Sequence, residues 1–202
     1  MEKAAARVCR EAGARVSENT FLRDLNLDGI RPDDGRRLEV IANGLPIYGG
    51  MQLAIDTTLV SPVRGDGTAR PRAAYVDGAA IAHAEADKAS TYPEFSTSTR
   101  CKLIVLAFEV GGRWSQQAVD FVWALAKSKA ATVPPLLRRA AEQAYFHRWT
   151  GMLAFAAGNA FAASLLEEPL DGTYNINGEE PDVLDVLADA RLIEGPEISR
   201  MR

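Results

Sequence analysis

The alternation of apolar and polar positions along the chain predicts a mixture of helices and strands. Helical spacing of apolar residues predicts a helix over residues 3–13, and β-type patterns predict strands at 14–22, 37–42, 51–60 and 102–110. Asn43-Gly44 indicates a hairpin between the second and third strands. The run MQLAIDTTLV at 51–60 is almost continuously apolar, which favours a central position in the sheet. Further helices are expected at 73–90, 115–130, 136–166 and 182–190.

The order of these elements predicts an α/β (mixed α+β) fold with a small mixed sheet flanked by helices. Residues 25–35 and 61–72 are rich in Gly, Pro and Asp or Arg, which is typical of loops. Pro134-Pro135 is the strongest boundary signal in the chain. We therefore expect a domain over residues 1–130, a helical extension over 134–168, and a short helix with a charged tail over 169–202.

Composition narrows the possible classes of protein. The 202 residues are 47% hydrophobic and carry a net charge of −4, which argues against a generally basic nucleic-acid coat protein. A nuclease stays possible, because its active site is acidic and its basic surface can be local. The two cysteines have no zinc-ligand spacing, the N-terminus has no signal-peptide pattern, and residues 149–166 are rich in small residues. We expect an intracellular protein, nuclear if the source is eukaryotic, that does not span a membrane.

An acid inside the most apolar strand is the main candidate for chemistry. Asp56 would cost desolvation energy unless it is paired or bound to a metal ion. The segment Arg31-Pro32-Asp33-Asp34 precedes it, and Glu85, Lys88 and Tyr92 follow on a predicted helix. Carboxylates at two points of the chain and a lysine at a third are what a metal-dependent phosphodiesterase site needs.

These residues, in this order, resemble the PD-(D/E)xK or restriction-endonuclease-like superfamily. The closer resemblance is to the restriction-like endonuclease domain of some non-LTR retrotransposons. That domain has an Arg-Pro-x-Asp element, similar to residues 31–34, and an apolar-Asp-Val-Thr-Val strand, similar to residues 55–60. It also has a lysine four residues before a tyrosine, similar to Lys88 and Tyr92, and a later strand running into an acid and a glycine, similar to residues 108–114. The resemblance covers about residues 4–130.

The resemblance implies a DNA endonuclease that uses Mg²⁺ (or Mn²⁺). It implies Asp34, or Asp33, and Asp56 as metal ligands, with Lys88 beside the attacking water or the phosphate. Supporting roles would fall to Asp33, Glu85, Tyr92 and Glu109, and DNA phosphate contacts to Arg31, Arg64, Arg70 and Arg72. Thr58 stands where the superfamily usually has its lysine, so Lys88 must reach the site from the helix. A reverse transcriptase domain would lie outside this chain.

Two other functions fit the sequence. The fold can be a catalytically inactive remnant that serves as a DNA-binding or protein-interaction module, which the long Asp34-to-Asp56 spacing and the acidic composition favour. Residues 134–166 can also form a helical interaction surface, because the segment is alanine-rich and amphipathic. The sequence leaves the target site and the oligomeric state open.

Overall fold

A four-stranded mixed sheet forms the centre of the protein in a computed structural model that describes residues 1–25, 27–166 and 178–193. The strands are β1 (Arg15–Phe21), β2 (Arg37–Asn43), β3 (Gln52–Val60) and β4 (Cys101–Glu109), in that spatial order. The pairs β1–β2 and β2–β3 are antiparallel, whereas β3 and β4 are parallel. The predicted mixed sheet is thus confirmed, and β3 lies between two neighbours as its apolar run predicts.

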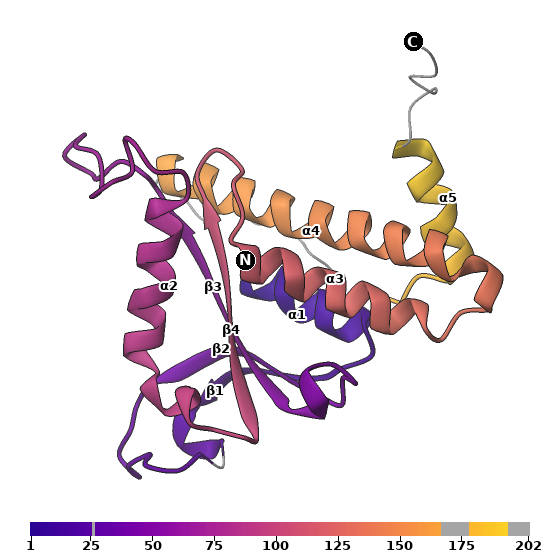
Figure 1. Ribbon diagram of the computed structural model, residues 1–202, viewed down its shortest axis with the longest axis horizontal. Helices are drawn as coiled ribbons and strands as arrows, with labels where there is room; N and C mark the ends of the chain where they lie inside the picture. The colour runs from indigo at the N-terminus through magenta and orange to yellow at the C-terminus, as the bar shows by residue number, and fades with distance from the viewer. Residues whose placement is uncertain (26, 167–177, 194–202) are drawn as a thin grey trace.

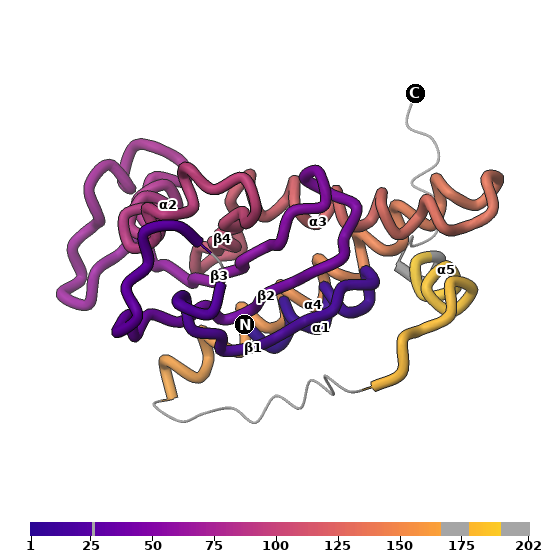
Figure 2. The backbone as a smooth tube through the Cα atoms, turned by 90° about the horizontal axis from the view of Figure 1, so that it is seen from below, coloured from indigo at the N-terminus to yellow at the C-terminus, as the bar shows by residue number. Residues whose placement is uncertain are grey.

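Helices cover both faces of this sheet. In Figure 1, α2 (Ala79–Thr91) lies on one side, and α1 (Glu2–Glu11), α3 (Gln116–Ala130) and α4 (Arg138–Leu166) lie on the other. The tube in Figure 2 shows the same grouping from below. The last described helix, α5 (Val183–Ile193), packs on α4. Short 3-10 turns occur at Leu22–Asp24, Tyr48–Gly50, Pro93–Ser96 and Pro135–Leu137.

The predicted helix over residues 73–90 is wrong at its start. The helix α2 begins only at Ala79, and residues 73–78 form turns that extend the preceding loop. Two backbone positions explain the difference, because Arg72 and Gly78 have φ angles of 64° and 75°. Left-handed backbone at these positions interrupts a right-handed helix, and the alanine-rich composition alone did not reveal it.

The main core combines the predicted first domain with the predicted helical extension. The buried face of α4, through Ala141, Tyr145, Trp149 and Leu153, belongs to the same apolar cluster as Val8, Ile55 and Phe121. Val186 of α5 is buried there too. The boundary at residue 134 stays a prediction, but α4 and the sheet share one core. The predicted tail over 169–202 lies partly outside the described residues.

The C-terminal part of α4 is much more exposed than its N-terminal part. Phe155 is 60% exposed and Leu165 is 67% exposed. By length and composition alone, residues Pro135–Leu166 are long and apolar enough to cross a membrane. Because the buried residues of α4 pack in the main core, its N-terminal half has a structural role in this fold. The exposed half keeps the hypothesis of an interaction surface open.

A buried ion cluster joins α1 to α4. Glu11, 2% exposed, accepts hydrogen bonds from Arg7 Nε (2.8 Å), from Arg148 Nε and Nη2 (both 3.0 Å) and from Trp149 Nε1 (2.8 Å). Burial alone would raise the pKa of Glu11, but the hydrogen bonds from Arg148, Trp149 and Arg7 outweigh it and lower that pKa. Arg7 also donates to the carbonyls of Gly178 and Glu179, so the same cluster holds the segment before α5.

Glu11→Gln is therefore expected to lower the free energy of unfolding by about 2–4 kcal/mol at neutral pH, because two arginines lose their buried counter-charge. Since the pKa of Glu11 is lowered in the folded state, its contribution is present above the unfolded pKa and is lost as the pH falls. Urea unfolding from pH 3 to pH 7 measures both effects. Glu2→Gln, on the exposed face of the same helix, is the matched control and should change stability by less than about 0.5 kcal/mol.

Candidate active site

The crossover from β3 through α2 to β4 places Lys88 against Asp56. Asp56 lies in the middle of β3 and is 2% exposed. Lys88 Nζ lies 2.8 Å from Asp56 Oδ2, and the lysine side chain is 30% exposed. The contact between Lys88 Nζ and Asp56 Oδ2 is an ion pair. Lys88 thus reaches Asp56 from the helix, as the sequence leads us to expect, but it contacts the acid directly.

Glu39 is a third charged residue at this point, and sequence reasoning missed it. The β2–β3 register pairs Val40 with Ile55, and continuing it by one residue brings Glu39 opposite Asp56. Glu39 Oε2 accepts hydrogen bonds from the Thr57 main-chain N–H (2.8 Å) and the Thr57 hydroxyl (2.6 Å). The Glu39 carboxylate therefore accepts the hydrogen bond that a main-chain carbonyl of β2 would accept if the strand pairing continued. The polar position within the alternating strand RLEVIA was the available signal, but it reads equally well as a solvent-facing residue.

The charges of the three groups influence one another. Burial raises the pKa of Glu39; hydrogen bonds from Thr57 oppose that shift, and the nearby Asp56 adds to it. Burial alone would lower the pKa of Lys88, but the Asp56 carboxylate outweighs it and the pKa of Lys88 is raised. Lys88 is therefore a stable cation at neutral pH. Two acidic side chains and one fixed cation share a largely buried space.

Tyr92 closes the site at the end of α2. Its hydroxyl donates to the Arg37 carbonyl at 3.0 Å, and its ring packs edge-on against Phe95. Burial and the Asp56 carboxylate raise the pKa of Tyr92, so its phenol stays protonated. This agrees with the packing role of a helix-end tyrosine more than with proton transfer.

Asp34 belongs to a different cluster. Its carboxylate accepts hydrogen bonds from the Arg36 main-chain N–H (2.8 Å) and from Arg36 Nη2 (2.7 Å), and Arg36 also pairs with Glu94. The Arg36 hydrogen bonds hold the pKa of Asp34 below its usual range. Asp33 pairs with Arg31 at 3.7 Å on the exposed surface. Among the described residues, no interaction joins Asp33 or Asp34 to Asp56.

Within the described part of the chain, no interaction joins the remaining predicted site residues to Asp56. Glu85 lines a cavity on the flank of α2 that faces β4. Glu109 lies at the end of β4, where its Oε2 is 3.7 Å from Arg113 Nε. Arg64, Arg70 and Arg72 lie in the loop before α2, at the end of the helix opposite to Lys88 and Tyr92. Of these three, Arg70 donates to the Ser61 carbonyl at 2.8 Å.

The residues described by the structure contain no group of three or more His, Cys, Asp or Glu side chains that could hold a metal ion. The strand register brings the carboxylates of Asp56 and Glu39 together, and the charge of Asp56 contributes to the raised pKa of Glu39. Mg²⁺ in phosphate-handling sites is commonly bound by only one or two carboxylates, with the other ligands supplied by substrate phosphate and water. The donor set is therefore small but suited to such an ion.

Comparison with known proteins gives no family for this chain. No protein-family model matches the sequence, and no curated protein matches it. The functional argument consequently depends on the site itself.

Removing Lys88 is expected to destabilise the fold through the buried Asp56 carboxylate. Lys88→Met should lower the free energy of unfolding by about 1–3 kcal/mol, because Asp56 is left without its counter-charge. The double variant Asp56→Asn with Lys88→Met should be more stable than Lys88→Met alone. Urea unfolding of the four proteins in this double-mutant cycle measures the coupling. A double variant that is less stable than Lys88→Met would contradict the ion-pair interpretation.

Glu39 gives a pH-dependent prediction. A raised pKa in the folded state means that Glu39 favours folding while protonated, and that this contribution is lost as the pH rises through the folded pKa. Glu39→Gln keeps an oxygen for the Thr57 N–H but removes the ionisation. The variant should therefore gain stability relative to the wild-type protein as the pH rises above about 4.5. Parallel urea titrations from pH 4 to pH 8 test this, and a constant difference would overturn it.

Proposed function

We propose that this protein is a metal-dependent DNA endonuclease of restriction-like type and retroelement origin, with Glu39, Asp56 and Lys88 at its active site. The observation that carries the proposal is Asp56, a fully buried acid in a central strand that is paired with a lysine from the crossover helix. A fold of this size does not need such a pair, since an apolar side chain of similar volume would avoid the desolvation cost. The pair therefore favours chemistry over structure.

The order of elements supports the same proposal. A helix, three antiparallel strands, a crossover helix and a parallel strand follow one another as the resemblance leads us to expect. The lysine reaches the strand acid from α2, which is the relocation that distinguishes the retroelement domains from the acid-x-Lys arrangement. We propose Glu39 as the second carboxylate in place of Asp34, because Glu39 shares the environment of Asp56 while Asp34 is occupied by Arg36.

The residues present suit Mg²⁺ or Mn²⁺ held by Glu39 and Asp56. Each carboxylate has one oxygen to which no described residue donates a hydrogen bond, Oε1 of Glu39 and Oδ1 of Asp56. Burial raises the pKa of Glu39 and the nearby Asp56 carboxylate adds to the shift, and a divalent cation would offset both effects. When bound, such an ion lowers the pKa of a water ligand and polarises the phosphate.

The chain's own groups then have distinct roles in hydrolysis, in which water adds across a P–O bond. Attack by water places additional negative charge on the phosphate oxygens, and the Lys88 ammonium is the fixed cation that stabilises it. The attacking water must lose a proton, which passes to solvent, because the free oxygen Oε1 of Glu39 would hold the metal ion in this arrangement. The ion pair with Asp56 keeps Lys88 charged and oriented. The leaving oxygen takes its proton from solvent.

The alternative is a catalytically inactive restriction-like module that binds DNA or a protein. The direct contact of Lys88 Nζ with Asp56 Oδ2 favours it, since that oxygen is then not free for a metal ion. The two functions differ in a simple respect. An active enzyme must bind divalent metal ions through Asp56, whereas an inactive module needs only the folded surface.

Plasmid nicking tests the proposal. The purified chain with Mg²⁺ or Mn²⁺ should convert supercoiled DNA to the open circle, and Asp56→Asn should reduce the rate by about 10²–10⁴-fold because the ligand charge is lost. Lys88→Ala and Glu39→Gln should each reduce it by about 10²-fold or more. Absence of nicking, or equal nicking by Asp56→Asn, would refute catalysis and favour the inactive module.

Asp34→Asn separates the two assignments of the second carboxylate. The amide oxygen of the substituted side chain can still accept a hydrogen bond from Arg36, so folding should be preserved and nicking should stay within about threefold of wild type. A loss as large as that of Asp56→Asn would instead make Asp34 the second ligand. Circular dichroism and urea unfolding of each variant exclude loss of fold as the cause.

A further inference from the structure

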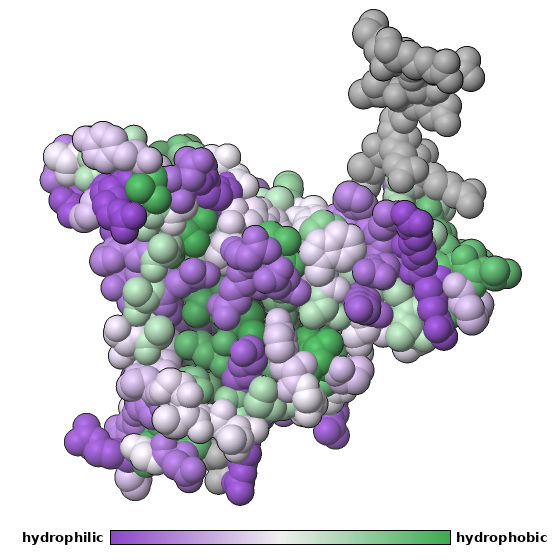
Figure 3. Space-filling model, in the orientation of Figure 1, coloured by the Kyte–Doolittle hydropathy of each residue, from purple (hydrophilic) through white to green (hydrophobic). Residues whose placement is uncertain are grey.

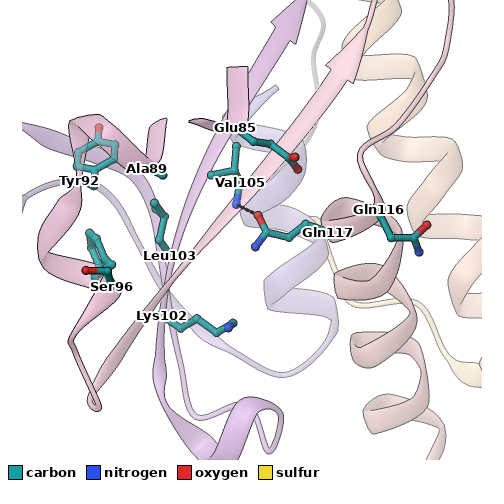
Figure 4. A pocket seen from close by; sticks show the side chains of 10 residues that line it. Glu85, Ala89, Tyr92, Ser96, Lys102, Leu103, Val105, Gln116 and Gln117 are labelled. Carbon is teal, nitrogen blue, oxygen red and sulfur yellow. Dashed lines mark hydrogen bonds between the residues drawn. The ribbon is translucent and has the colours of Figure 1, made fainter. Parts of the chain in front are cut away.

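A cavity of about 540 Å³ lies beside the outer edge of β4, between α2 and α3 (Figure 4). Its lining combines apolar and polar side chains: Glu85, Ala89, Tyr92, Phe95, Ser96, Lys102, Leu103, Val105, Gln116 and Gln117. In the space-filling view of Figure 3, apolar side chains lie between polar ones over this part of the molecule. The volume is in the range of pockets that hold small organic ligands.

The edge of β4 is capped from within the chain on both sides of this cavity. Alternate residues direct their main-chain groups outward, and several of these groups find hydrogen-bond partners within the chain. The N–H groups of Cys101, Val105 and Glu109 donate to Ser98 Oγ (3.1 Å), Gln117 Oε1 (2.8 Å) and the Arg113 carbonyl (2.8 Å), and the Ala107 carbonyl accepts from Ser115 N–H (2.9 Å). Leu103 lies in the same alternating set, at the cavity wall. Within the described residues, neither its N–H nor its carbonyl has a hydrogen-bond partner.

This pattern excludes addition of a peptide strand. Strand addition needs a run of alternate residues with unpaired main-chain groups. The N–H groups two positions before and after Leu103 are already occupied by Ser98 and Gln117. A ligand can therefore hydrogen-bond this edge mainly at Leu103. It would need an acceptor for the Leu103 N–H and, beside it, a donor for the Leu103 carbonyl. The edge of a nucleobase has that arrangement in a planar, compact form.

The polar side chains of the cavity add to this selectivity. Gln117 uses its Oε1 for the Val105 N–H, as Figure 4 shows, which leaves its Nε2 as a donor. The Glu85 carboxylate also lines the cavity, and no described residue hydrogen-bonds to it. A carboxylate accepts hydrogen bonds from amino groups. Guanine, adenine and cytosine have an exocyclic amino group, and thymine has none.

The cavity lies next to the proposed active site. Glu85 and Ala89 face the cavity on one flank of α2, and Lys88 faces Asp56 on the other. Residues three or four apart on a helix have Cβ atoms about 5–6 Å from each other. Tyr92 belongs to both places, since it lines the cavity while the Asp56 carboxylate influences its pKa. A phosphate beside Lys88 thus has space for a neighbouring base in this cavity.

We propose that the cavity binds one unpaired nucleobase that carries an amino group, close to the phosphate that is cut. The proposal rests on the proposed nuclease function and makes its substrate more specific: DNA with a single-stranded segment at the cleavage site. The Leu103 main chain and Gln117 Nε2 engage the base edge, and the Glu85 carboxylate accepts from the amino group. Tyr92 and Phe95 supply the apolar wall.

Binding without cleavage tests this. The probes are fluorescein-labelled DNA hairpins with a four-nucleotide single-stranded tail of dG, dA, dC or dT, titrated with the full chain in EDTA and followed by anisotropy. The tails of amino-bearing bases should bind about three- to tenfold more tightly than the dT tail, the worth of one or two hydrogen bonds. Equal affinity for all four tails would overturn the proposal.

Two variants assign the preference to the cavity. Glu85→Gln replaces the carboxylate by an amide of the same size and should reduce the preference over dT to less than about twofold. Glu2→Gln is the matched control, with the same change of charge on α1, and should keep the full preference. A preference that survives in Glu85→Gln would exclude this cavity as the source.

Addition of deoxyguanosine gives a direct readout on the main chain. In a ¹⁵N–¹H spectrum, the Leu103 amide should shift with the added nucleoside, and the Glu109 amide, already bonded to Arg113, should not. An unmoved Leu103 amide would count against the proposal. Base preference without any nicking would support the cavity and refute the nuclease, whereas nicking without base preference would do the reverse.

Discussion

The ion pair between Asp56 and Lys88 is the interaction that determines how this site is built. A charged carboxylate in the interior of an apolar strand needs a counter-charge close by, because the protein interior solvates a charge much less well than water does. The parallel pairing of β3 with β4 requires a crossover, and α2 supplies both the crossover and the lysine. The connectivity of the sheet and the electrostatics of the site are therefore linked: a different register of α2 on the sheet would leave the acid unpaired.

Glu39 shows how a charged residue can serve the sheet and the site together. Its carboxylate accepts from the N–H and the hydroxyl of Thr57, where the β2–β3 ladder has ended. The Thr57 N–H of β3 thus bonds to a side-chain carboxylate where a neighbouring strand would otherwise supply a carbonyl. The same hydrogen bonds hold Glu39 beside Asp56. The cost is a carboxylate with a raised pKa. Residues with perturbed pKa values from burial and a specific charged neighbour are frequent at functional sites, which is why we give this pair more weight than the surface acids.

The outer edge of β4 has a comparable arrangement. Unpaired sheet edges invite association, and proteins usually cover them. Here the side chains of Ser98 and Gln117 and the main chain of residues 113–115 bond to the edge of β4. The main chain of Leu103 is left uncovered, at the wall of the cavity. On the face of the sheet opposite to α2, the Glu11 cluster joins α1, α4 and the segment before α5. Helices therefore pack on both faces of the sheet, and the candidate site lies on the face that α2 covers.

The sequence by itself determined the element order and the central position of β3, and it identified Asp56 and Lys88 as candidate site residues. Apolar periodicity and an acid within a buried strand are local signals. The sequence did not determine the start of α2, where left-handed backbone at Arg72 and Gly78 overrides helix-forming composition. Only the tertiary structure separated Asp34, bound by Arg36, from Glu39, brought opposite Asp56 by the strand register. The reason is physical: which carboxylates meet depends on register and side-chain partners across the sheet, and these are properties of residues far apart in the chain.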